Sequence, residues 1–158
     1  MVFPNAYKAK KNKLDALDAG TVYADGDQFQ TGQYSYRHAM RDKGQSIDDA
    51  MEKAHAFVRR QFEKAKKLLA EGKINEGYYQ FAIGLHALQD ATSPAHSGFQ
   101  EWGDKVPISK QIAHVVQELK YPGTKSNLQQ VTNQYLNWFE HSNAPLPKEN
   151  LFSKIKSD

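Results

Sequence analysis

The 158-residue chain contains no cysteine. Disulfide bonds and thiol catalysis are therefore excluded, and histidine, aspartate and glutamate are the side chains left to hold a metal ion. Hydrophobic runs are also short, and none approaches the roughly 20 residues that cross a bilayer. The first residues, MVFPN, lack the long apolar core of a secretory signal peptide. The chain therefore either stays where it is made, or is a mature fragment or the end of a longer protein.

An excess of charge of one sign is missing as well. The chain has 21 Lys and Arg against 18 Asp and Glu, a net charge of +3, which is too small to indicate nucleic-acid binding by itself. A composition that is 39% hydrophobic and 25% charged is ordinary for a soluble globular protein. The length predicts a single domain over residues 1–158, with a core large enough to need no cross-links.

Alternation with the period of a β-strand is almost absent, whereas apolar residues recur at the spacing of three and four that is typical of helices. Residues 20–45 and 91–106 are rich in turn-forming residues, and we expect loops there. We predict an all-α fold, a compact bundle of about five helices. The expected helices cover residues 7–19, 46–70 (from a Ser46 cap to a stop at Gly72), 74–90, 108–120 and 126–141.

Acidic residues follow three of the six histidines at a distance of four positions: His38 with Asp42, His86 with Asp90, and His114 with Glu118. On a helix this spacing places both side chains on one face, close enough to bind one ion. The ordinary alternative is an ion pair at the surface, as for His38 with Asp42. His86 and Asp90, however, lie on a helix that is apolar nearly all round, where a charge is costly unless it is paired or bound to metal.

A longer pattern joins these residues. Residues 85–96, LHALQDATSPAH, have the form H-x3-D-x5-H, and residues 114–118 add H-x3-E. Upstream, Asp25 and His38 precede the long helix expected over 46–70. In this order, over residues 24–118, the chain resembles bacterial zinc-dependent phospholipase C. Each piece alone is common, but the complete order is specific.

This resemblance implies an all-α fold around a zinc cluster and assigns ligands to two zinc ions. His38, His86 and Asp90 would hold one ion, and the other would be held by His96, His114 and Glu118. Imidazoles and carboxylates are suitable ligands for zinc. Two zinc ions can activate a water molecule for attack on a phosphodiester. Asp25 matches the family carboxylate that orients or deprotonates this water, and Asp27 lies near enough in sequence to be confused with it.

Two features of the family are not matched. The family completes a third zinc site with the mature N-terminal amine and a histidine of the first helix, and here no histidine precedes His38. The residues that select a choline headgroup have no clear counterpart, so the headgroup stays open. Zinc-dependent single-strand nucleases share the fold and ligand pattern. The motif therefore specifies phosphodiester cleavage better than it specifies a lipid. The leading expectation is a zinc-dependent phosphodiester hydrolase that acts on phospholipid at a membrane surface. The weak basicity disfavours the nuclease, and a non-enzymatic metal-stabilised binding domain is the third alternative.

Residues 93–102, SPAHSGFQEW, also resemble toxin domains at the C-termini of Rhs-type polymorphic proteins. This resemblance implies a domain delivered to a target cell as part of a longer secreted protein, with an immunity protein as partner. In the same segment, Phe99 and Trp102 are expected either to contact acyl chains or bases or to pack in the core. Of the two remaining histidines, His55 is interpreted as a packing or surface residue. His141 lies near the end of an expected helix, where it would complement the helix dipole rather than bind metal.

Overall fold

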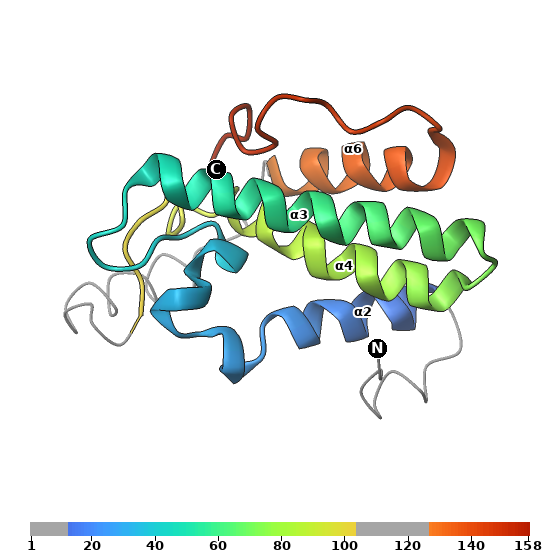
Figure 1. Ribbon diagram of the computed structural model, residues 1–158, viewed down its shortest axis with the longest axis horizontal. Helices are drawn as coiled ribbons and strands as arrows, with labels where there is room; N and C mark the ends of the chain where they lie inside the picture. The colour runs from blue at the N-terminus through green and yellow to red at the C-terminus, as the bar shows by residue number, and fades with distance from the viewer. Residues whose placement is uncertain (1–12, 104–126) are drawn as a thin grey trace.

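In the computed structural model, which describes residues 13–103 and 127–158, the architecture is helical (Figure 1). Its α-helices are α2 (Lys13–Ala24), α3 (Ile47–Ala70), α4 (Ile74–Asp90) and α6 (Asn127–His141), with the 3-10 helices η1 (Asp27–Phe29) and η2 (Gly32–His38) between α2 and α3. Within these ranges the only β pairing is an isolated bridge between Arg41 and Glu101. The prediction of an all-α fold is confirmed, and the helix expected over residues 108–120 lies outside the described residues.

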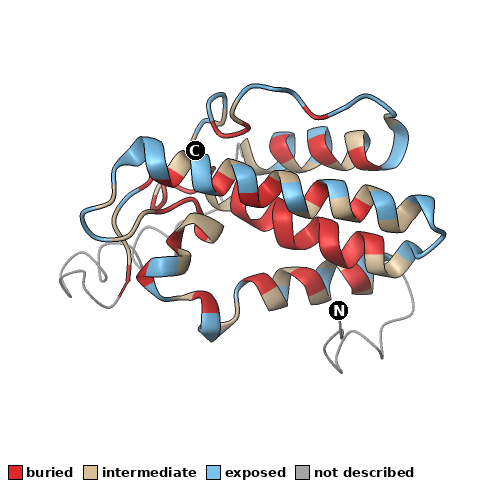
Figure 2. Ribbon diagram, viewed as in Figure 1, coloured by how far each residue is buried: buried red, intermediate tan, exposed pale blue. Residues whose placement is uncertain are grey.

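Helix α4 is the central element of the bundle. It packs against α3, α2 and α6, and every residue from Gly77 to Leu88 is buried (Figure 2). The expectation that this helix is buried on all sides is therefore confirmed, and its burial extends to the turn that carries His86. No helix in the described part of the chain is both long and apolar enough to cross a membrane.

Stacked aromatic rings join the three helices on one side of the core. The ring of Phe81 in α4 lies 4.9 Å from that of Phe62 in α3 and 4.4 Å from that of Phe139 in α6, and both pairs are stacked. On the other side, α2 approaches α4 so closely that a Cβ at Gly20 would collide with the Tyr79 carbonyl oxygen. Burial of such large rings is a major source of stability, so these contacts hold α4 in place.

Helices α3 and α4 begin and end close to their predicted limits, and α6 ends at its predicted limit. At the start of α3 the Ser46 hydroxyl accepts a hydrogen bond from the Asp49 amide, at 3.1 Å, as a capping residue does. Beyond its end, Gly72 adopts the left-handed conformation, with φ +77°, that glycine favours. Helix α4 covers the predicted residues 74–90. Helix α6 ends at the predicted residue 141, and its expected start at residue 126 lies outside the described residues.

The N-terminal part departs from the prediction. Helix α2 ends at Ala24, five residues beyond the expected limit of 19, because Gly20 serves close packing against α4 and does not end the helix. The stretch 20–45, expected to be a loop, contains η1 and η2. Buried Phe29 anchors these short turns, since its ring contacts those of Tyr23 and Tyr34 edge to face. Residues 91–103 form turns without a helix, as expected.

The last residues of the chain connect the loop after α4 with the start of α6. Phe152 packs edge to face on Phe99, with 5.4 Å between ring centroids. The Asp158 amide donates to the Thr92 carbonyl oxygen at 2.9 Å, and its carboxylate accepts from the amide of Asn127 at 2.6 Å. Asp158 therefore acts as a capping side chain for α6, supplied from a distant part of the sequence.

Replacing Asp158 with alanine removes this cap, and we expect the free energy of unfolding to fall by about 1 kcal/mol. Urea unfolding followed by circular dichroism measures the change. Asp158→Asn keeps an acceptor oxygen and should stay close to the wild type. Equal stability of the alanine variant and the wild type would show that the contact does not stabilise α6.

Candidate metal centre

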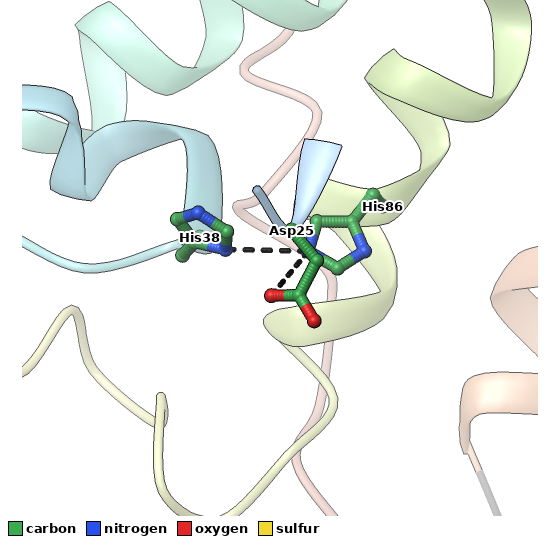
Figure 3. A group of neighbouring side chains, drawn as sticks. All are labelled: Asp25, His38 and His86. Atoms are coloured by element: carbon green, nitrogen blue, oxygen red, sulfur yellow. Dashed lines mark hydrogen bonds and ion pairs between the residues drawn. The ribbon is translucent and has the colours of Figure 1, made fainter. Parts of the chain in front are cut away.

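Three segments bring the candidate site residues together at one end of α4. Asp25 follows α2, His38 is the last residue of η2, and the final turn of α4 carries His86 and Asp90. Immediately after His38, Ala39 adopts a left-handed backbone conformation with φ 51°, which ends η2 and redirects the chain. The side chains of Asp25, His38 and His86 converge on one point (Figure 3).

Ligand atoms of His38, His86 and Asp90 form a nearly equilateral triangle. Asp90 Oδ2 lies 3.0 Å from His38 Nδ1 and 3.2 Å from His86 Nε2, and the two nitrogens are 3.2 Å apart. With zinc–nitrogen bonds of 2.0–2.1 Å, neighbouring ligand atoms of a tetrahedral zinc ion are about 3.3 Å apart. The triangle therefore has the dimensions of one face of a zinc coordination tetrahedron.

The Asp25 carboxylate lies beside this triangle. Its Oδ1 is 4.0 Å from His86 Nε2, and with the two histidines it forms a group whose ligand atoms all lie within 4.8 Å of one another. Its side chain is 65% exposed, so solvent reaches it. Asp27 is exposed at the start of η1 and does not line the cavity at the site. Of the two carboxylates weighed from the sequence, Asp25 is the one at the histidine pair.

Burial and charge act against each other at this site. Burial favours neutral His86, but the charge of Asp90, its hydrogen bond and the charge of Asp25 prevail and raise the His86 pKa. Burial likewise opposes ionisation of Asp90, but the charge of His86 and hydrogen bonds from His38 and His86 hold the Asp90 pKa well below its usual range. An ionised carboxylate beside two buried imidazoles is a set of donors suited to a divalent cation.

His96 lies next to the triangle, but its Nδ1 faces the backbone of His38 and not the triangle's ligand atoms. Its Nδ1 donates a hydrogen bond to the His38 carbonyl oxygen and lies 4.0 Å from Asp90 Oδ2. A backbone contact of this kind fixes the tautomer with the proton on Nδ1. His38 has its Nε2 buried, with no hydrogen-bond partner among the described residues.

A cavity of about 260 Å³ opens at these residues. Besides the predicted site residues, its wall includes Gln30, Met40 and Trp102. Trp102 was considered in the sequence analysis as a residue that contacts substrate or packs in the core. Gln30 and Met40 were not predicted, because no motif marks them and their position depends on η1 and η2. The wall therefore combines carboxylates and imidazoles with an apolar side.

The remaining sequence predictions have separate outcomes. His114 and Glu118 lie outside the described residues. The local pair of His38 with Asp42 is not formed: His38 contacts Asp90, and Asp42 Oδ1 accepts from the Lys43 amide at 2.8 Å. His55 and Phe99 have packing positions that were considered from the sequence: the His55 Nδ1 accepts from the Leu151 amide, and Phe99 is buried. His141 lies in the last turn of α6, as expected, and is 70% exposed.

Comparison with known proteins identifies no relative of this chain. No protein-family model, no curated protein and no solved structure matches the chain. The phospholipase C resemblance therefore depends on the motif residues, and of these the structure brings Asp25, His38, His86, Asp90 and His96 to one cavity.

Proposed function

We propose that the protein is a zinc-dependent phosphodiester hydrolase of the phospholipase C type that acts on phospholipids. The observation that carries this proposal is the triangle of His38, His86 and Asp90, with Asp25 beside it, in the wall of a solvent-accessible cavity. The resemblance to Rhs-type toxin domains extends the proposal to an antibacterial effector delivered within a longer protein, with an immunity protein as its partner in the producing cell.

Each residue has a defined role in this proposal. His38, His86 and Asp90 bind one zinc ion, and His96 binds a second together with His114 and Glu118. Bound zinc would supply a Lewis acid and lower the pKa of water near the phosphodiester. Asp25, exposed and 4.0 Å from His86 Nε2, orients that water and accepts its proton.

The wall of the cavity favours a phospholipid over a nucleic acid. Among the described residues that line it, none is lysine or arginine, and the polar members are two aspartates, three histidines and Gln30. A polyanionic strand would need cationic side chains along its backbone. Trp102, which is partly exposed, instead offers apolar surface, and a tryptophan that lines a site suits a membrane interface.

The first prediction concerns metal. His86→Ala should lower both the zinc content and the melting temperature, because metal that binds only the folded state contributes to its stability. His55→Ala is the matched control: His55 accepts from the Leu151 amide and does not line the cavity, so this variant should keep its zinc. Elemental analysis after gentle purification and thermal unfolding measure both effects; about two zinc ions per chain are expected in the wild type. Equal zinc loss in both variants, or a wild type without zinc, would contradict the assignment.

A second prediction separates proton transfer from metal binding. Asp25→Asn keeps the size of the side chain and an oxygen acceptor but loses the base, so turnover should fall by about 100-fold or more while zinc is retained. Asp27→Asn is the control and should be nearly silent, since Asp27 does not line the cavity. Zinc loss in the Asp25 variant would show that Asp25 is a zinc ligand. Full activity of the Asp25 variant together with an inactive Asp27 variant would show that Asp27 is the base.

A third prediction concerns the substrate. The protein should release diacylglycerol and phosphorylated headgroup from phosphatidylcholine or phosphatidylethanolamine and leave single-stranded DNA intact. Trp102→Ala should reduce activity on bilayers more than on short-chain monomeric lipid, because only bilayers require interfacial anchoring. Degradation of DNA with the phospholipids untouched would favour the nuclease instead.

A further inference from the structure

We propose that Gln30 is a positioning residue whose side-chain amide holds the Asp25 carboxylate toward the histidine pair. This inference rests on the proposed function, because it assigns Gln30 a part in presenting Asp25 to the same site. Neither the sequence motif nor the predicted ligand set includes Gln30.

The contact joins the side chains directly. Gln30 Nε2 donates to Asp25 Oδ1 at 3.2 Å and also lies 3.4 Å from the Asp25 carbonyl oxygen. The same Oδ1 is the atom 4.0 Å from His86 Nε2, so the amide contacts the oxygen that faces the site. Both residues line the cavity.

Turn η1 places the amide there. The chain reverses after Asp25 through hydrogen bonds from the Phe29 amide to the Gly26 carbonyl oxygen at 2.9 Å and from the Gln30 amide to that of Asp27 at 3.2 Å. The turn is anchored by Phe29, which is buried against Tyr23 and Tyr34, with the Arg37 guanidinium 4.0 Å above its ring. Gln30 therefore follows an anchored residue, and its backbone position is fixed.

Asp25 needs such a partner because little else restrains it. Its side chain is 65% exposed, and Gln30 is the described residue that donates a hydrogen bond to its carboxylate. An unrestrained carboxylate would turn away from the water that it must deprotonate, and misplacement of a catalytic group by about 1 Å can cost 100-fold in rate. A neutral amide suits the task, because it donates to the carboxylate without adding a competing negative charge.

The test is a double-mutant cycle on turnover and zinc affinity. Gln30→Ala should lower kcat by about 10-fold with KM and zinc affinity close to the wild type, as for supporting residues around other metal sites. In the Asp25→Asn background the same change should have no further effect, because a positioning residue acts only through its partner. Gln30→Glu should be at least as impaired as Gln30→Ala, since it cannot donate and repels Asp25. Gln28→Ala is the matched control and should keep full activity, since Gln28 is exposed in the same turn and does not line the cavity.

A measurement that needs neither metal nor substrate separates this inference from the proposed function. In the metal-free protein, the side-chain amide NMR signal of Gln30 should shift on Asp25→Asn and not on Asp27→Asn. Losses that add in the double variant, or a Gln30 signal insensitive to Asp25→Asn, would overturn the inference. A wild type that binds no zinc and cleaves no phosphodiester would overturn the proposed function, and with it the positioning role, even if the signal shifts.

Discussion

The contact of one carboxylate oxygen with two buried imidazoles organises this end of the molecule. Asp90 Oδ2 lies within 3.2 Å of both His38 Nδ1 and His86 Nε2, and the two histidines are only 4% and 8% exposed. A charge in such surroundings is costly unless it is compensated, so the fold must bring a partner to the end of its central helix. Two imidazoles supply that partner, and a divalent cation bound between the three groups would compensate the charge more completely.

The neighbouring segments are arranged to keep these groups in place. The backbone after His38 pairs with the backbone after His96: the Arg41 amide donates to the Gln100 carbonyl oxygen at 3.0 Å, and the Trp102 amide donates to that of Arg41 at 2.9 Å. The Arg41 guanidinium also contacts the Glu101 carboxylate at 2.9 Å. These contacts join the segment that follows His38 to the segment that carries Trp102, and both segments line the cavity.

The sequence predicts well what depends on local spacing. The limits of α3 and α4 follow from apolar periodicity, the Ser46 cap and Gly72, and the pairing of His86 with Asp90 follows from four-residue spacing on a helix. The approach of His38, 48 residues before His86, cannot be read from spacing, and only the family resemblance placed it at the site. Gln30 was missed for a related reason, since its contact with Asp25 depends on a 3-10 turn in a stretch that has the composition of a loop. The first helix was likewise expected to end at residue 19, but Gly20 lies inside α2, where it allows close packing against the Tyr79 carbonyl oxygen.

The most direct test of a zinc ion between His38, His86 and Asp90 is a crystal of the purified protein measured at energies above and below the zinc absorption edge. The account predicts an anomalous difference peak that disappears below the edge and lies about 2.0–2.2 Å from His38 Nδ1, His86 Nε2 and Asp90 Oδ2. Zinc-soaked crystals with these side chains ordered, but with no zinc peak between the three atoms, would contradict it.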